Sequence, residues 1–143
     1  ARWIALEIDG KVVAGARIAP TTAHCGNHSY MLRDAQLGLL PNLPSDLLYE
    51  PAPVQKYIWE ATRLFVSDSV PSDQRLLVQS HLMREIAAAI CSVGATHAIG
   101  IVPAVFNRWL KRIGMTASEM GPVKILDGDK VQAALIIAST YNA

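Results

Sequence analysis

The segment from Trp59 to Val66 places three polar groups inside a sequence that otherwise has the composition of a buried β-strand. Aromatic and branched residues favour strands, yet Glu60, Thr62 and Arg63 lie among them. A buried strand accommodates such groups only where they pair with one another or face a cleft. The segment therefore predicts a strand beside either a cluster of paired polar side chains or a functional cleft.

Side chains of a strand alternate between the two faces of a sheet. On this basis Glu60, Thr62 and Leu64 are expected on one face, and Arg63 and Phe65 on the other. The carboxylate and the hydroxyl should thus face the same space, with the guanidinium on the opposite side.

Turn residues and hydrophobic periodicity divide the rest of the chain into short elements. Asp9-Gly10 and Asp127-Gly128-Asp129 each separate two apolar runs and predict hairpins. Residues 22–54 contain four prolines and predict a long loop that covers a site, with a short helix near 32–40. The other predicted elements are strands 3–8, 12–18, 59–66, 96–102, 123–126 and 131–138, and helices 72–94 and 103–114.

This order of elements is typical of an α+β fold with helices packed on a mixed sheet. The length of 143 residues predicts a single domain, residues 1–143. A net charge of +1 gives no general basis for nucleic-acid binding, and no stretch approaches the roughly 20 apolar residues that span a bilayer. Cys25 and Cys91 lie far apart, which suggests neither a disulfide nor a metal site and fits a reducing compartment.

Two short motifs carry further information. The first contains Gly15, Arg17, Pro20 and Thr21. The second contains Trp59, Glu60, Arg63 and Val66, with Thr62 where a serine is usual. With this pair of motifs the chain resembles the autoinducer synthases, the acyl-homoserine-lactone synthase family, and the order of the later elements extends the resemblance over nearly the whole chain.

The resemblance implies the three-layer α/β/α fold of GNAT-type acyltransferases, whose mixed, mostly antiparallel central sheet is splayed into a V-shaped cleft. In that fold the strands corresponding to 59–66 and 96–102 separate, and the pantetheine arm of an acyl donor enters between them. The family also has an N-terminal segment that covers the substrate. This chain starts where the family enters its first core strand, so we expect that segment to lie outside the sequence given.

The resemblance further implies a bacterial, cytoplasmic acyltransferase that makes a quorum-sensing signal. The amine of S-adenosylmethionine attacks an acyl thioester, and its carboxylate then closes the lactone with release of methylthioadenosine. S-adenosylmethionine is thus a substrate, an acyl-phosphopantetheine on acyl-carrier protein or coenzyme A is the donor, and no bound cofactor or metal is expected. Two alternatives stay open: an N-acyl amino acid synthase or other GNAT-type N-acyltransferase, and a non-catalytic acyl-binding module.

Four residues are the candidates for catalysis. Glu60 is expected to accept a proton from the substrate amine, directly or through water. Arg17 and Arg63 are expected to orient Glu60 or to bind a substrate carboxylate, and Thr62 offers a hydroxyl or simply favours a strand. The structural alternative for Glu60 is an ion pair with one arginine, whose charge is expected to lower the carboxyl pKa.

Gly100 occupies the position where some members of the family place a hydroxyl beside the acyl chain. We predict an acyl group without a 3-oxo substituent or a wider pocket, unless Gly100 only allows two backbones to approach closely. The candidates for the acyl-tail pocket, each also a candidate for ordinary core, are Ile99, Ile101, Phe106, Trp109 and Leu110.

Basic residues near the end of the chain are candidates for docking an acidic carrier protein, although a solvated helix face is the common explanation of such a cluster. They are Arg108, Lys111, Arg112 and Lys124. The turn from Ser67 to Gln74 lacks the glycines with which relatives that use acetyl-coenzyme A hold pyrophosphate. This absence favours a carrier-protein donor.

Overall fold

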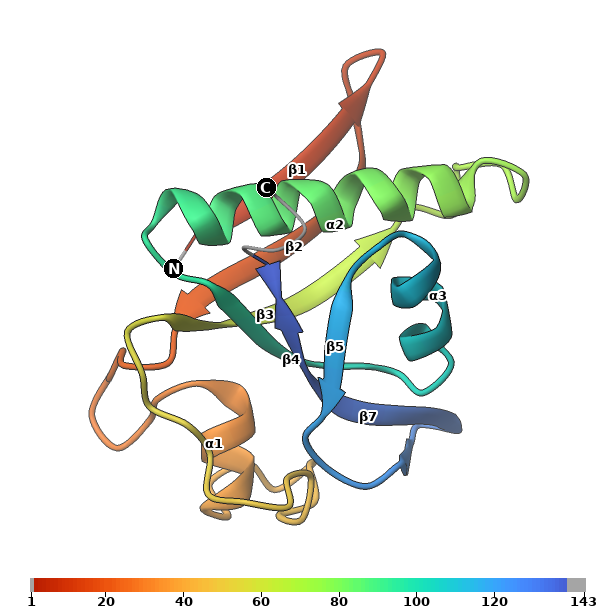
Figure 1. The fold of residues 1–143 in the computed structure, drawn as a ribbon. Helices are drawn as coiled ribbons and strands as arrows, with labels where there is room; N and C mark the ends of the chain where they lie inside the picture. Colours follow the sequence, from red (N-terminus) through yellow and green to blue (C-terminus); the bar gives the residue numbers. More distant parts are fainter. Residues whose placement is uncertain (1, 139–143) are drawn as a thin grey trace.

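The computed structural model describes residues 2–138. A twisted sheet forms its centre, with helices and loops on both sides (Figure 1). The elements are β1 (Arg2–Ile8), β2 (Lys11–Pro20), α1 (Met31–Gln36), β3 (Ile58–Val66), α2 (Arg75–Ser92), β4 (His97–Pro103), α3 (Phe106–Arg112), β5 (Thr116–Glu119), β6 (Lys124–Leu126) and β7 (Asp129–Ile137).

Within residues 2–138, seven strands are arranged in the order β1-β2-β3-β4-β7-β5, and β6 pairs with β7. Only the β3–β4 pair is parallel among the pairs described, so the sheet is mixed and mostly antiparallel, as predicted. Both predicted hairpins form. Asp9 and Gly10, with φ of 51° and 78°, supply the left-handed backbone that a two-residue hairpin turn requires, and Asp127 and Gly128 do the same between β6 and β7.

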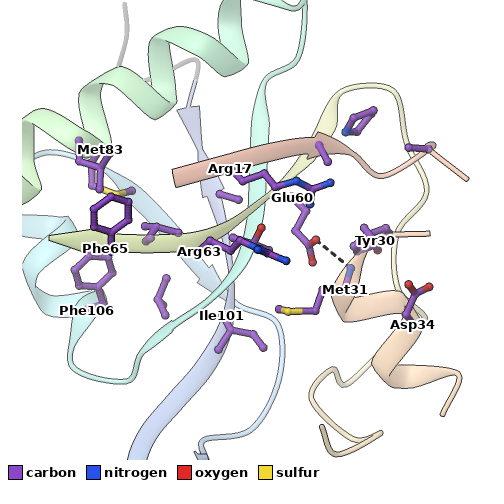
Figure 2. A pocket seen from close by; sticks show the side chains of 18 of the residues that line it. Arg17, Tyr30, Met31, Asp34, Glu60, Arg63, Phe65, Met83, Ile101 and Phe106 are labelled. Carbon is purple, nitrogen blue, oxygen red and sulfur yellow. Dashed lines mark hydrogen bonds between the residues drawn. The ribbon is translucent and has the colours of Figure 1, made fainter. Parts of the chain in front are cut away.

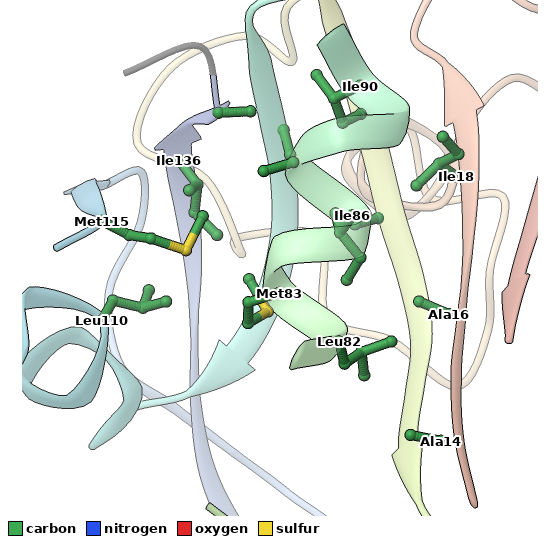
Figure 3. Close-up of a cluster of buried hydrophobic side chains, with 14 of the residues drawn as sticks. Ala14, Ala16, Ile18, Leu82, Met83, Ile86, Ile90, Leu110, Met115 and Ile136 are labelled. Atoms are coloured by element: carbon green, nitrogen blue, oxygen red, sulfur yellow. The ribbon is translucent and has the colours of Figure 1, made fainter. Parts of the chain in front are cut away.

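One face of the sheet packs against α2. The apolar stripe of this helix, which includes Leu82, Ile86 and Ile90, meets small residues such as Ala14 and Ala16 on β2 (Figure 3). Each large side chain of this kind contributes about 1.5–3 kcal/mol when it is fully buried. The fit of large side chains against small ones holds α2 close to the strands that line the site.

The other face of the sheet is covered by α1 and the long loop around it. A second apolar cluster, which includes Leu32, Leu47 and the strand residues Ile58 and Ile99, lies beneath them. The molecule therefore has the predicted three layers, with the sheet between two covers. Within residues 2–138, no helix combines the length and apolar character needed to cross a membrane.

Three details differ from the expectations. β5 was not predicted, because its sequence Thr-Ala-Ser-Glu has little apolar character and the strand forms by pairing with β7. Pro103 ends β4, paired with Val131, instead of starting the following helix. The long helix begins at Arg75, because Gln74 N–H donates to the carbonyl of Pro71 and the preceding residues form a separate turn.

Candidate active site

Strands β3 and β4 part after three residue pairs. Ile58, Trp59 and Glu60 pair with His97, Ala98 and Ile99, respectively, and no further pairs join the two strands. Beyond this point β3 continues along β2 and β4 continues along β7. The strands diverge in Figure 1, and a cleft of about 780 Å³ opens beside them, lined by residues 60–66 and 101–103. This is the predicted V-shaped cleft.

A β-bulge distorts β3 where it lines the cleft. Arg17 pairs with Thr62, whereas Gly15 pairs with Phe65, so β3 has one residue more than β2 over this stretch. Arg63 has a φ of 56°, in the left-handed region that residues with a side chain rarely adopt. The bulge therefore places backbone strain directly at the cleft.

The bulge also changes which side chains share a face, so the prediction of uninterrupted alternation was wrong. Leu64 packs with Ala61 against the α2 core instead of facing the same way as Glu60. Arg63 lies on the opposite face, where its guanidinium stands 6.0 Å from the ring centroid of Trp3. One extra residue thus moves a cation onto the face that carries the carboxylate.

Both carboxylate oxygens of Glu60 accept hydrogen bonds from the start of α1. Met31 N–H donates to Oε1 and Leu32 N–H donates to Oε2, each at 3.0 Å, and Figure 2 shows the bond to Met31. Residue Tyr30, which precedes the helix, provides no side-chain cap. Glu60 therefore caps α1 from a neighbouring strand, where its negative charge also suits the positive end of the helix.

The loop that contains α1 is fastened at further points. Asp34 accepts hydrogen bonds from the backbone N–H and the hydroxyl of Ser29, both at 2.8 Å. The hydroxyl of Thr21 donates to the carbonyl of Gln55 at 2.9 Å, and Gln55 N–H donates back to it at 3.0 Å. Thr21, the last residue of the first motif, thus connects the two ends of the long loop, part of which lines the cleft.

The predicted ion pair between Glu60 and an arginine does not form among the described residues. Burial raises the pKa of Glu60 above its usual value, although the two backbone hydrogen bonds and the charge of Arg17 lower it. The expectation that neighbouring arginines would lower the pKa of Glu60 below its usual value was therefore wrong. Glu60 is only 2% exposed, and its desolvation outweighs the charge of Arg17. A raised pKa makes the carboxylate a stronger base.

The raised pKa predicts a specific pH dependence of stability. A carboxyl group whose pKa is higher in the folded state stabilises the protein at a pH below its pKa in the unfolded chain, near 4.5. This contribution to stability is lost as the pH rises through the pKa of the folded state. The unfolding free energy of the wild type relative to that of Glu60→Gln should therefore fall as the pH rises. Urea unfolding of both proteins from about pH 4 to pH 8 measures this difference. A difference that increases with pH would show that the hydrogen bonds outweigh burial.

All four candidate catalytic residues line the cleft. Arg17, Glu60 and Arg63 extend into the same region in Figure 2, and Thr62 is buried beside them. Neither Arg17 nor Arg63 forms an ion pair with a carboxylate of the described residues. Two such cations beside a buried carboxylate provide groups for both ends of an α-amino acid, a carboxylate and an amine.

The acyl-tail candidates occupy different places. Ile101 and Phe106 line the cleft, whereas Ile99 and Leu110 are fully buried in the core. Trp109 stacks on Phe106, with ring centroids 4.5 Å apart, and packs against the α2 core.

Gly100 lies just beyond the last β3–β4 pair. A Cβ atom on this residue would stand 2.7 Å from the carbonyl oxygen of Ala61 on β3. The close approach of the two backbones therefore requires a glycine here, which favours the packing explanation of this residue.

The docking candidates are on the surface. Arg108, Lys111 and Arg112 are exposed on α3, while Lys124 forms an ion pair with Asp46 in the long loop. The ion pair also holds the pKa of Asp46 below its usual range. Lys124 thus differs from the three residues of α3 in being held by an acidic partner.

Several residues of α2 reach the cleft without having been predicted from the sequence as site residues. They are Arg75, Gln79, Leu82 and Met83. The apolar spacing of the helix indicated only that it packs on the sheet. The polar Gln79, next to the buried Val78, was a weak signal that this helix also lines a cleft. The backbone donors of Met31 and Leu32 had no signal in the sequence, since every residue of that loop has an N–H group.

Comparison with known proteins gives an independent view. No protein-family model matches the chain. The chain is 31% identical over 137 residues to an acyl-homoserine-lactone synthase of Ralstonia nicotianae. The alignment covers 93% of this chain and 61% of that protein. The chain thus spans about three fifths of the length of this relative.

Solved structures agree on the fold. TofI, in a ternary complex with an inhibitor and MTA, superposes with a TM-score of 0.74 at 22% identity, over 95% of this chain and 63% of TofI. BjaI, a CoA-dependent acyl-homoserine lactone synthase solved with SAM and isopentyl-CoA, gives 0.68 at 19% identity, over 98% of this chain and 60% of BjaI. A protein from Desulfovibrio desulfuricans described as belonging to the GNAT family gives 0.55 at 12% identity, over 95% and 67% of the two chains. The chain therefore has the GNAT-type fold and is similar in sequence to an acyl-homoserine-lactone synthase.

Proposed function

We propose that the chain contains the acyl-transfer site of an acyl-homoserine-lactone synthase. The observation that carries the proposal is the parting of β3 and β4 after Glu60, which opens a cleft lined by the buried carboxylate of Glu60 and by Arg17 and Arg63. The likeness in sequence to a synthase of this kind supports it. The substrates are S-adenosylmethionine and an acyl thioester on a phosphopantetheine arm.

In the first step the amine of S-adenosylmethionine attacks the thioester carbonyl and the thiol leaves. Glu60 accepts the proton of the amine, directly or through one water, and its raised pKa favours this role. Backbone N–H groups that the β3 bulge frees from the ladder stabilise the oxyanion of the tetrahedral intermediate. Arg17 and Arg63 bind the substrate carboxylate.

In the second step the carboxylate oxygen attacks the γ-carbon of the same molecule. The carbon–sulfur bond breaks, and methylthioadenosine leaves as the lactone closes. Nucleophile and leaving group already belong to one molecule, so the site needs mainly to hold them in line. Arg63, which the bulge fixes at the cleft, is the residue proposed to orient the carboxylate.

The donor is proposed to be an acyl-carrier protein. The turn before α2 contains Asp68 and Asp73 and no glycine, which disfavours the pyrophosphate of coenzyme A. Arg75, the first residue of α2, donates to the backbone carbonyls of Ser67 and Val66 at 2.9 and 3.3 Å. The positive charges of Arg108, Lys111 and Arg112 on α3 remain at the surface for an acidic carrier.

Mass spectrometry of the products tests the proposal. Full-length protein supplied with S-adenosylmethionine and an acyl-carrier-protein donor should form an acyl-homoserine lactone and methylthioadenosine in equal amounts. The same acyl group on coenzyme A should give a kcat/KM lower by at least about tenfold. An N-acyl product without methylthioadenosine would indicate an N-acyl amino acid synthase, and no product with any amine would indicate an acyl-binding module.

A further inference from the structure

Two carboxylates bind the backbone at the start of α1, and the proposed mechanism uses only one of them. Glu60 accepts hydrogen bonds from the N–H groups of Met31 and Leu32. Asp34, in the first turn of the helix, accepts hydrogen bonds from the backbone N–H and the hydroxyl of Ser29, both through Oδ1. Figure 2 shows Glu60 and Asp34 on two sides of the start of α1. Residues 29–32 are therefore held by both carboxylates.

Asp34 is buried although it carries a charge. It is 5% exposed and lines the cleft, and no basic side chain of residues 2–138 forms an ion pair with it. Arg33 is connected to it only through Ser29, whose hydroxyl accepts a hydrogen bond from Arg33 Nη1 at 3.1 Å. A neutral side chain such as asparagine accepts the same hydrogen bonds without the cost of burying a charge. The charge of Asp34 therefore indicates a role beyond these two bonds.

That charge acts on Glu60. Burial raises the pKa of Glu60, and the negative charge of Asp34 raises it further, whereas the two backbone hydrogen bonds and the charge of Arg17 lower it. A like charge nearby disfavours the ionised form of a carboxyl group. A carboxylate whose pKa is raised in this way is a stronger proton acceptor.

Asp34 is the one carboxylate besides Glu60 among the described residues that line the cleft. β4 adds no titratable group, since its residues at the cleft, 101–103, are apolar. Burial and the charge of Glu60 raise the pKa of Tyr30, so its phenol stays neutral near pH 7. The remaining titratable groups of the lining are Arg17 of β2, Arg63 of β3, Arg75 of α2, and His24 and Cys25 of the long loop.

We infer that Asp34 is a positioning residue for the acyl-transfer step, which fixes the backbone donors of Met31 and Leu32 on Glu60 and makes Glu60 a stronger base toward the substrate amine. The inference rests on the proposed function. The hydrogen bonds of Asp34 determine where Glu60 is held, because they order the turn that carries its donors. The charge of Asp34 opposes that of Arg17, which weakens the base.

Asp34→Asn separates the charge from the hydrogen bonds. Asparagine has nearly the same size, and its oxygen accepts both bonds of Ser29 without a charge. In full-length protein the titration of the Glu60 carboxyl group, followed by carbon-13 NMR, should move to lower pH. The acid limb of the pH profile of kcat/KM should move with it, and the plateau should fall about two- to tenfold because the base is weaker. Acyl-pantetheine serves as the donor.

Asp34→Ala removes both the charge and the acceptor. The titration of Glu60 should move in the same direction as in Asp34→Asn. Amide hydrogen exchange of residues 29–32 should also become about fivefold faster or more, as expected for loss of a helix cap. Asp34→Asn, which keeps the acceptor, should stay near the wild-type exchange rates.

Asp46→Asn is the matched control. Asp46 is an exposed carboxylate of the same loop that pairs with Lys124 and does not line the cleft. The change removes the same charge, and the titration of Glu60 and the acid limb should stay at their wild-type pH.

Two results would contradict the account in different places. If Glu60 titrated alike in Asp46→Asn and in either folded variant of Asp34, the inference would be overturned, because Asp34 would then only cap α1. If the titration of Glu60 moved but the acid limb of kcat/KM did not, the coupling of the two carboxylates would stand. The proposed function would then lose Glu60 as its base.

Discussion

Glu60→Ala is expected to abolish acyl transfer and to release α1 from the sheet. The change removes the proposed base, which contributes about 10²–10⁴ to the rate in sites of this kind. It also leaves the N–H groups of Met31 and Leu32 without their acceptors. Leu32 is fully buried, and a buried donor without a partner costs about 1–3 kcal/mol. Single-turnover kinetics and hydrogen exchange of residues 29–36 measure the two effects.

Glu60→Gln separates the two roles. Glutamine keeps the size and one acceptor oxygen but does not ionise, so α1 should stay closer to its wild-type protection while the rate falls by at least about 10²-fold. If this variant retained wild-type turnover with an unchanged pH profile, Glu60 would be a residue that only caps α1. The proton of the amine would then go to another group.

Gly100→Val is expected to have the second large effect. Its Cβ would approach the carbonyl oxygen of Ala61 to 2.7 Å, and a backbone atom cannot move away as a side chain does. The strain falls next to the last pair, Glu60 with Ile99, so β3 and β4 should separate further and displace the carboxylate. Overpacking of this kind costs about 1–3 kcal/mol. The midpoint temperature of thermal unfolding and kcat/KM should both decrease.

Ile101→Val is the control for Gly100→Val. Ile101 is the next residue of β4 and lines the cleft, and loss of one methyl group costs about 0.5–1.5 kcal/mol. This variant should keep its activity within a few-fold of wild type. A Gly100→Val protein as stable and as active as this control would contradict the claim that β3 and β4 lie too close together at Gly100 for a side chain.

Local signals in the sequence were sufficient for much of the fold. The Asp-Gly pairs form turns because their backbone adopts positive φ with little strain, and both hairpins follow from them. The apolar spacing of α2 correctly predicted that Met83, Ile86 and Ile90 are buried, whereas Leu76, expected on the same face, is exposed. β5 could not be predicted, because its polar residues become a strand only by pairing with β7.

The candidate site was predicted in its residues but not in its geometry. The polar groups of β3 identified the cleft, and Arg17, Glu60 and Arg63 all line it. The bulge at Arg63 had no signal, since neither glycine nor asparagine marks its left-handed backbone. The pKa of Glu60 is raised because the residue is buried under α1. Met31 and Leu32, which contact Glu60, precede it by 29 and 28 positions in the sequence, and local spacing cannot show such a contact.

A crystal structure of the full-length protein with a non-hydrolysable acyl-pantetheine tests the central claim most directly. We predict that the pantetheine arm lies between residues 61–66 of β3 and 101–103 of β4, with the acyl carbonyl near Glu60. An arm bound elsewhere, with the space between the two strands filled by the protein's own side chains, would contradict this assignment of the cleft.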